Sequence, residues 1–268
     1  MTSLTDKIAT LFQLEPLHPF GIKITANRDA DITELNGNHL KALVAEHHLV
    51  LLRGFNCLAK ENLVQYAQSL GPLLEWDFGQ VMEMQVQAMP KNYLFTHGPV
   101  PFHWDGAFHQ VPSLLLFHCI QAPLPQSGGE TVFCNTPLLW QEASPVEQQQ
   151  WQSYTLHFKT EKLAHYGGTI QIPLVQQHPV TKQTVLRFAE PVPDTLLNPV
   201  EAQVAQLTAT ASADFFTAMA ERCYQARYCY SHTWQQDDFL IADNHSLIHG
   251  RNAFKEFSPR HLRRIQVL

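Results

Sequence analysis

Short strand-like runs separated by turn residues dominate the chain after about residue 80, and this pattern constrains the fold more than any other feature. Apolar or alternating runs predict strands at residues 113–120, 130–134, 154–158, 184–188, 239–243 and 263–267. Pro, Gly, Asn and Gln separate these runs, and the connections are long and irregular. The pattern favours a jelly roll or a barrel with helices packed outside it, and it argues against a repeated strand–helix–strand fold.

Helical periodicity is confined to a few segments. Within the strand-rich region it predicts helices at residues 144–153 and 200–223, and before that region it predicts helices at 34–47 and 60–70. A strand-like apolar run at 48–53 lies between the last two. No repeat, low-complexity segment or Gly/Ser linker marks a boundary, so residues 1–268 are expected to form a single domain whose core strands start near residue 80.

Composition excludes several classes of protein. Hydrophobic residues make up 45% and charged residues 16% of the chain, which excludes disorder, a coiled coil and a collagen-like fibre. A net charge of −6 argues against a nucleic-acid partner. No apolar run has the length of a membrane helix or follows the start in the manner of a signal peptide. The 5 cysteines form no C-x-x-C pair, so a cytoplasmic protein without disulfides or a cysteine-ligated metal is expected.

An H-x-D pair lies at His103-Trp104-Asp105, ahead of Gly106. Residues two apart on a strand face the same side, so the imidazole and the carboxylate can bind one ion. By itself the pair is a common coincidence, and a solvated turn explains it as well. The 15 histidines of the chain are only a weak further hint of a metal.

A second histidine segment follows the predicted strand 239–243 and contains His245 and His249. One of these, added to His103 and Asp105, gives the facial triad of non-haem Fe(II) oxygenases. A bidentate 2-oxo acid and O₂ can fill the three positions that the triad leaves open, and a planar Arg suits the far carboxylate of the acid. A zinc pair on a helix is rejected, because no Glu follows His245 and a strand precedes it.

Five motifs in order resemble the taurine dioxygenase (TauD/TfdA) group of Fe(II)/2-oxoglutarate-dependent dioxygenases over nearly the whole chain. They are Arg53-Gly54-Phe55 with Leu70-Gly71-Pro72-Leu73, His103-Trp104-Asp105, Gly128-Gly129-Glu130-Thr131, His178-Pro179 with Val185-Leu186, and Trp234-Gln235-Gln236-Asp237-Asp238 through Asp243-Asn244 to His249. Arg260 stands where the group has its 2-oxoglutarate arginine. One departure is Gln236-Asp237, where a Gly often precedes the Asp.

The resemblance implies a double-stranded β-helix core and an enzyme that uses Fe(II), 2-oxoglutarate and O₂. It implies that His103, Asp105 and His249 are the metal ligands. Asp105 is retained, whereas the halogenases of the group carry a small residue there to leave room for chloride, so halogenation is not expected.

The same resemblance assigns the residues that bind organic ligands. Arg260 is expected to bind the C5 carboxylate of 2-oxoglutarate, with Thr131 adding a hydroxyl donor. Arg264 lies four residues further on and on a strand shares that face, so it is expected to bind a carboxylate of the substrate. Arg263 is then expected to point outward.

A narrower resemblance concerns the substrate. The segment from Tyr93 to Phe108 is similar to the PvcB-type branch, which oxidises isocyanide derivatives of aromatic amino acids, often by desaturation with decarboxylation to a vinyl isocyanide. A small carboxylate-bearing substrate is therefore expected. Hydroxylation and desaturation both stay open, and so does a taurine- or sulfonate-type hydroxylase.

The remaining expectations concern a non-catalytic alternative, the residues around the active site and the oligomeric state. A non-catalytic, metal-bound cupin-like protein would not need the oxo-acid arginine, so retention of Arg260 argues against it. His97, His109, Phe102 and Phe108 are candidates for the cavity wall. The region 161–182, with two glycines after His165-Tyr166, lies where the group has a mobile lid. A homo-oligomer stays open.

Overall fold

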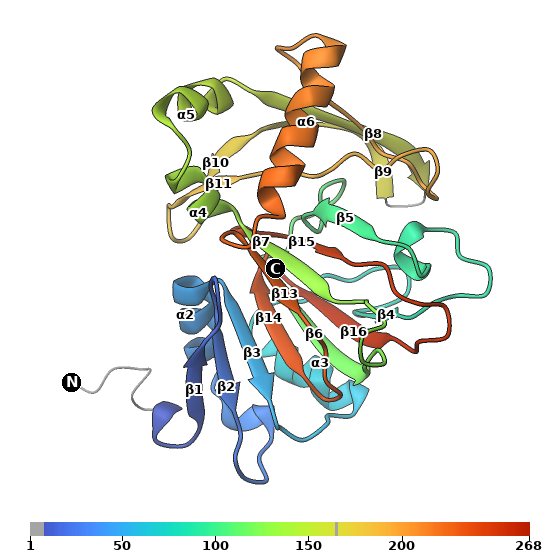
Figure 1. Ribbon diagram of the computed structural model, residues 1–268. Coiled ribbons are helices and arrows are strands. Elements are labelled where there is room, and N and C mark those ends of the chain that lie inside the picture. The colour runs from blue at the N-terminus through green and yellow to red at the C-terminus, as the bar shows by residue number, and fades with distance from the viewer. Residues whose placement is uncertain (1–7, 164–165) are drawn as a thin grey trace.

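The computed structural model describes residues 8–163 and 166–268, and most of their strands lie in two facing sheets (Figure 1). The larger sheet has seven strands in the order β1-β2-β3-β14-β6-β16-β4. Their bounds are β1 Gln13–Pro16, β2 Ile22–Thr25, β3 Leu49–Arg53, β4 Val81–Met84, β6 Leu114–Gln121, β14 Phe239–Asp243 and β16 His261–Val267. All neighbours are antiparallel except β2 and β3, which are parallel.

A four-stranded sheet in the order β13-β7-β15-β5 faces the larger one. Its strands are β5 Val100–His103, β7 Thr131–Asn135, β13 Cys229–His232 and β15 Leu247–Arg251. Phe117 and Leu240 of the large sheet pack against Phe133 and Leu247 of the small sheet. Because side chains alternate along each strand, this contact defines the inner faces of a double-stranded β-helix. The predicted mainly β jelly roll is confirmed.

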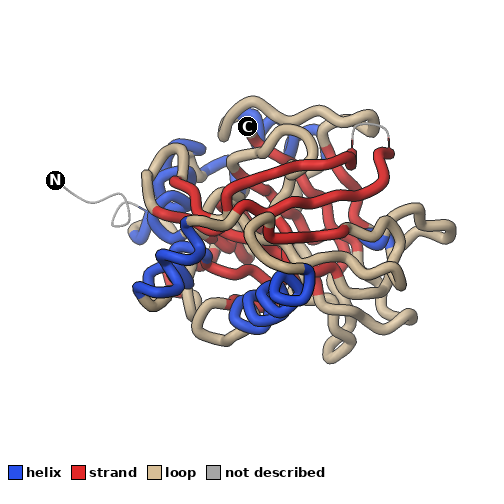
Figure 2. The backbone as a smooth tube through the Cα atoms, turned by 90° about the horizontal axis from the view of Figure 1, so that it is seen from above, coloured by secondary structure: helices blue, strands red, loops and turns tan. Residues whose placement is uncertain are grey.

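Helices lie at the periphery of the strands (Figure 2), and further strands also pack on the outer face of the small sheet. Two helices, α2 Gly37–His47 and α3 Lys60–Gln68, contribute to the core on the outer face of the large sheet. On the other side lie α4 Thr136–Gln141, α5 Pro145–Gln152 and α6 Ala209–Cys223, with 3-10 turns η1 Ile32–Glu34 and η2 Tyr93–Phe95 elsewhere. None of the helices within the described residues has the length and apolarity needed to cross a membrane.

The core starts earlier in the chain than the strand pattern predicted. Strand β3 lies inside the large sheet between β2 and β14, well before residue 80. Its residues Leu49 to Leu52 are all buried, because both faces of this strand are covered. The expectation that only later strands build the sheet was therefore wrong.

The predicted helix at 200–223 is a strand followed by a shorter helix. Glu201–Val204 forms β12 and pairs with β8, Thr155–Leu163, so pairing overrides the helix propensity of this alanine-rich stretch. Helix α6 then begins after Thr208, whose side chain accepts a hydrogen bond from the backbone N–H of Ala211. Helix α4 was missed, although Asn135 at its N-cap and Pro137 in its first turn are start signals.

The segment expected as a lid contains paired strands on both sides of residues 164 and 165, and His165 itself lies outside the described residues. Strand β9, Tyr166–Pro173, runs antiparallel to β8, and β10, Val175–Gln177, pairs with β11, Thr184–Leu186. Gly167 has a φ of 97°, and a Cβ there would lie 2.1 Å from the carbonyl oxygen of Glu161. This glycine is therefore required by the close approach of the two strands.

Candidate active site

Three side chains predicted as metal ligands meet on the inner face of the four-stranded sheet. His103 ends β5 and pairs with His249 on β15, and the centroids of the two rings are 4.4 Å apart. The Oδ1 atom of Asp105 lies 3.6 Å from Nε2 of His103 and 3.7 Å from Nε2 of His249. All three ligand atoms lie within 4.8 Å of one another, so one ion can contact them together.

The hydrogen bonding of the two imidazoles fits a metal. The Nε2 atom of His249 is buried and has no hydrogen-bond partner among the described residues. His103 donates from Nδ1 to the carbonyl oxygen of Pro101 at 2.9 Å, which leaves the lone pair of its Nε2 directed at the same space. Two neutral imidazoles and one carboxylate are the donor set of a non-haem Fe(II) site.

The charges at this site also suit a metal. Burial would raise the pKa of Asp105, but Arg264 and the two imidazoles outweigh it and hold the pKa well below its usual range. Burial lowers the pKa of His249 well below its ordinary value, and His103 adds to this shift. At neutral pH these two side chains are therefore deprotonated, as metal ligands must be.

Two donors from β16 hold the carboxylate of Asp105. Gln266 donates from Nε2 to Oδ2 at 2.5 Å, and Arg264 donates from Nη1 to Oδ1 at 3.1 Å. The amide oxygen of Gln266 in turn accepts from Nε1 of Trp76 at 2.5 Å. Gln266 was not predicted, although its offset of two from Arg264 on a strand is a signal that places both side chains on one face.

Loss of the amide of Gln266 is expected to weaken the metal site. Gln266→Leu should lower Fe(II) affinity about 10- to 100-fold, because outer contacts orient the ligand carboxylate. Trp76→Phe removes the indole N–H that donates to Gln266 but leaves the contact of Gln266 with Asp105 in place, so a smaller loss is expected. Anaerobic Fe(II) titration measures both, with Gln87→Leu, a cavity-lining glutamine, as the matched control. Equal affinity in Gln266→Leu and the wild type would contradict this role.

Asn244 holds the backbone around Asp105. Its Oδ1 accepts from the N–H of Asp105 at 3.0 Å, and its Nδ2 donates to the carbonyl oxygens of Asp105 at 3.1 Å and Pro112 at 2.9 Å. All of these groups are buried or nearly so, and the bonds therefore fix the position of Asp105 relative to the turn after β14. The Asp243-Asn244 motif thus has a geometric explanation.

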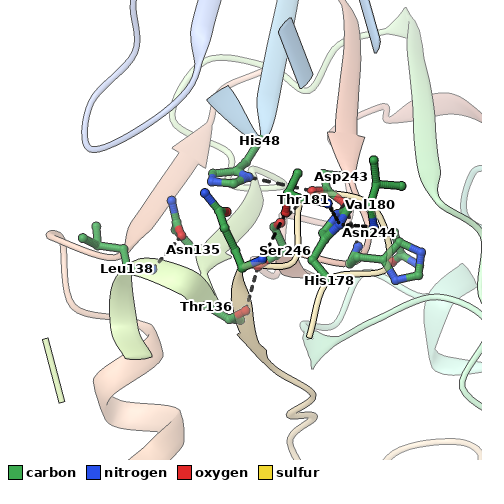
Figure 3. Close-up of polar contacts among 12 residues, drawn as sticks. His48, Asn135, Thr136, Leu138, His178, Val180, Thr181, Asp243, Asn244 and Ser246 are labelled. Carbon is green, nitrogen blue, oxygen red and sulfur yellow. Dashed lines mark hydrogen bonds and ion pairs between the residues drawn. The ribbon is translucent and has the colours of Figure 1, made fainter. Parts of the chain in front are cut away.

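A buried carboxylate fixes the turn that carries Asn244 (Figure 3). Asp243 accepts from Oγ of Ser246 at 2.6 Å and from Nε2 of His178 at 3.0 Å, and Nδ1 of His48 lies 3.7 Å away. The Nδ1 atom of His178 accepts from two backbone N–H groups, which places its ring proton on Nε2. Burial opposes ionisation of Asp243, but these partners hold its pKa well below the usual range.

Arg260 and Thr131 lie together one strand away from His249. Strand β7 pairs with β15, with Thr131 opposite Arg251 and Phe133 opposite His249, so Thr131 and His249 share a face. Arg260 donates from Nη2 to Oγ1 of Thr131 at 3.1 Å and from Nε to the carbonyl oxygen of Gly129 at 2.9 Å. The structure therefore joins the two residues predicted to bind 2-oxoglutarate.

The hydrogen bonds of Thr131 and Arg260 allow the two side chains to bind an anion as well. Trp234 donates from Nε1 to Oγ1 of Thr131 at 2.9 Å, so the hydroxyl oxygen accepts twice and its own hydrogen stays available to donate. Arg260 is buried, and among the described residues no carboxylate forms an ion pair with it. Burial lowers the pKa of Arg260 to about 9, which reflects the cost of a buried cation that a bound carboxylate would offset.

Arg264 faces the inside of the β-helix, as predicted, but it pairs with Asp105. Its Nη1 lies 3.0 Å from Oδ2 of Asp105. Its Nη2 lies 3.1 Å from Sδ of Met82, which is a weak acceptor. Arg263 points to the opposite face, where its Nε lies 3.4 Å from Oε1 of Glu83. Binding of a substrate carboxylate by Arg264 stays a prediction.

A cavity of about 780 Å³ opens beside the triad. His103, Asp105, Arg264 and Gln266 belong to its wall, and aromatic side chains make up much of the rest: Trp76, Phe78, Tyr93, Phe95, Phe102, Trp104, Phe108, His109 and Phe158. Of the predicted wall residues, His97 packs against Phe254 instead, with ring centroids 5.0 Å apart. A flat, apolar ring with a polar tail is the chemical shape that such a wall accommodates.

Comparison with known proteins agrees with this site. The family of taurine catabolism dioxygenases, TauD and TfdA, matches residues 13–266. The chain belongs to the TauD/TfdA family. It is an Fe(II)/2-oxoglutarate-dependent dioxygenase, and the prediction made from its motifs is confirmed.

Two curated relatives within this family share most of their length with the chain. The chain is 46% identical over 261 residues to a 3-((Z)-2-isocyanoethenyl)-1H-indole synthase of Fischerella ambigua, with 96% of both proteins covered. It is 35% identical over 254 residues to a tyrosine isonitrile desaturase of Pseudomonas aeruginosa, with 92% of this chain and 87% of the relative covered.

Solved structures of the same branch superpose well. PvcB of Pseudomonas aeruginosa gives a TM-score of 0.80 at 32% identity, with 96% of this chain and 91% of PvcB covered. A second PvcB structure, described as an Fe, α-ketoglutarate-dependent oxygenase from an isonitrile synthetic pathway, gives 0.79 at 31% identity. The TauD/TfdA fold of the chain is thereby established beyond the match of its motifs.

Proposed function

We propose that this dioxygenase oxidises an isonitrile derivative of an aromatic amino acid and releases the corresponding vinyl isonitrile. The substrate carboxylate loses one proton from the carbon next to the ring, two electrons and CO₂, and a double bond forms between the two carbons. The observation that carries the proposal is the aromatic cavity beside the triad, with Arg264 in its wall. The two curated relatives, an isocyanoethenyl-indole synthase and a tyrosine isonitrile desaturase, support this substrate class.

The proposed oxidation relies on bound groups that the residues described above suit. Fe(II) held by His103, Asp105 and His249 supplies, with 2-oxoglutarate and O₂, a two-electron oxidation and yields succinate and CO₂. Arg260 and Thr131 hold the C5 carboxylate of 2-oxoglutarate by charge-assisted hydrogen bonds. These contacts orient the co-substrate, and the buried surroundings keep water from the reacting atoms.

The cavity residues position the substrate. We propose that the indole or phenol ring lies among the aromatic side chains, with Phe102 and Phe108 on its walls. Arg264 then offers Nη2 to the substrate carboxylate, a better acceptor than the thioether sulfur of Met82 that Nη2 contacts in the described structure. The carboxylate is thereby held beside Asp105 and close to the metal.

A substrate panel tests this function. Succinate release should be coupled to product with the isonitriles of tryptophan and tyrosine, and mass spectrometry should detect a product that has lost CO₂ and two hydrogens relative to the neutral acid. Coupling should fall by at least about tenfold with the matching isonitriles that lack the carboxylate, because the charged contact with Arg264 is lost.

Two results would overturn parts of the proposal. Coupled turnover of taurine, with none of the isonitriles, would establish the sulfonate-type hydroxylase instead. A hydroxylated product that keeps its carboxylate would agree with the proposed substrate but would show that the reaction is hydroxylation and not desaturation.

For the location of the enzyme we propose the cytoplasm, since all five cysteines are free thiols.

A further inference from the structure

A second cluster of potential metal ligands lies on the far side of the large sheet from the active site. Side chains alternate along β6, so Phe117 faces inward, with its ring centroid 6.0 Å from that of His249, and His118 faces outward. Cys57, from the segment between β3 and α3, has its Sγ 3.8 Å from Nε2 of His118. Asp237, just before β14, has its Oδ1 3.8 Å from the same nitrogen.

His118 is buried, and only one of its two ring nitrogens has a partner within the described part of the chain. Its exposed fraction is 0%, and it stacks on Phe239 with ring centroids 4.1 Å apart and planes 12° apart. Among the described residues its Nδ1 has no hydrogen-bond partner. Its Nε2 faces the thiol of Cys57 and the carboxylate of Asp237, both at 3.8 Å. Burial lowers the pKa of His118 to about 4, so the ring is neutral at pH 7.

Asp237 brings a carboxylate to a position that favours glycine. Its φ is 64°, in the left-handed region where a side chain is strained, although Asp tolerates this region better than most residues. The conformation directs Oδ1 toward His118, whereas the next residue, Asp238, pairs with Arg53. A strained residue with its charged group aimed at a buried imidazole points to a function for that group.

We propose that Cys57, His118 and Asp237 bind a divalent transition metal of borderline softness, with Zn²⁺ the best match. A thiolate, an imidazole and a carboxylate are a mixed sulfur, nitrogen and oxygen set that zinc accepts, with water in the fourth position. The thiolate and the carboxylate together balance the charge of the ion. Cys57 is exposed, so the ion can enter from solvent.

The distances are close to those of a tetrahedral ion. Zinc ligands at about 2.3 Å for sulfur and about 2.0 Å for nitrogen and oxygen lie about 3.3 to 3.6 Å from one another. The two separations of 3.8 Å exceed these values by a few tenths of an ångström, and all three ligand atoms lie within 4.8 Å. Small movements of the exposed Cys57 and the half-exposed Asp237 close this gap, while His118 is held by packing.

Cobalt spectroscopy separates this site from the active site. The triad contains no sulfur, so a thiolate-to-Co(II) charge-transfer band reports only a cysteine ligand. Anaerobic titration of the metal-free protein with Co(II) should give this band in the wild type and in His249→Ala. Cys57→Ser should lose it, and Cys229→Ser, a half-buried thiol elsewhere, should keep it. Zn²⁺ should number two per chain in the wild type and one in Cys57→Ser by elemental analysis.

Two outcomes of the cobalt titration would refute the second site. One is the absence of the band in the wild type, and the other is the same band in Cys57→Ser. A measurement on the wild-type thiol guards against misfolding of the variants. Zn²⁺ should slow the reaction of Cys57 with a disulfide reagent at least about tenfold, because the metal occupies the thiolate. Asp237→Asn should remove most of this protection, and an unchanged wild-type rate also contradicts the proposal.

Discussion

His249→Ala is expected to abolish the visible charge-transfer band of the Fe(II)–2-oxoglutarate complex and nearly all succinate formation. Removing a residue that contacts a metal ligand costs about 10- to 100-fold in metal affinity. Loss of a ligand itself should therefore cost more than about 100-fold. The imidazole is buried, and its Nε2 has no other partner among the described residues. The substitution therefore removes a group whose bonding only a metal completes.

Anaerobic absorbance after addition of Fe(II) and 2-oxoglutarate measures this effect. His157→Ala, which removes a half-buried imidazole from β8, is the matched control and should keep both the band and the activity. Thermal unfolding of each variant without metal separates a lost ligand from a lost fold. A normal band in His249→Ala would show that the iron lies elsewhere.

Arg260→Met is expected to raise the KM for 2-oxoglutarate while leaving Fe(II) binding intact. Removing one partner of a buried charged pair costs about 2–5 kcal/mol, which corresponds to about 30- to 4,000-fold in affinity. Met keeps most of the apolar volume of the side chain, and Thr131 alone cannot supply a charge. Initial rates of succinate formation over a range of 2-oxoglutarate concentrations give the result.

Arg263→Met is the matched control for this experiment. It removes an arginine three residues further on, on the opposite face of β16, where the side chain contacts Glu83. Its KM for 2-oxoglutarate should equal that of the wild type. An unchanged KM in Arg260→Met, or an equal rise in both variants, would refute the role of Arg260.

Asp105 joins the candidate metal site to Arg264, because contacts from distant parts of the chain meet on this residue. Its carboxylate accepts from Gln266 and Arg264, and its backbone is held by Asn244. A substrate carboxylate that binds Arg264 would therefore act on a residue that already contacts a metal ligand. If Arg264 binds the substrate as proposed, one guanidinium group would connect substrate binding with the metal site.

Much of the site could be predicted because its signals are local. Strand alternation predicted one face for His103 and Asp105, but β5 ends at His103, and Asp105 reaches the same site from the turn that follows. The rule does hold on β16, where it places Arg264 inside and Arg263 outside. The predicted strand at 239–243 agrees with β14 in both bounds. This strand is buried on both faces, so its continuous apolar run, and not an alternation, marks it in the sequence.

Other features follow no local pattern. The region 161–182 was expected to be a lid because of its place in the resembled family; the local sequence did not indicate that Gly167 accommodates the close approach of β8 and β9. The strand Glu201–Val204 was expected to be helical. It is extended because it pairs with β8, a partner that the local sequence does not indicate. Residues such as Gln266 and Trp76 carry no motif, and their role depends on a partner across the sheet.

By itself, the sequence determined the β-rich class, and its motifs named in advance the three side chains that meet at the candidate metal site, because strand patterns and motif spacing are properties of neighbouring residues. Tertiary structure alone decided which groups hold Asp105, where β3 lies, and that Arg264 pairs with a metal ligand. Asn244 reaches Asp105 across 139 residues and Gln266 reaches it across 161. Such contacts form only when the two sheets pack together, since the hydrophobic burial that joins them is not directional and does not specify partners in the sequence.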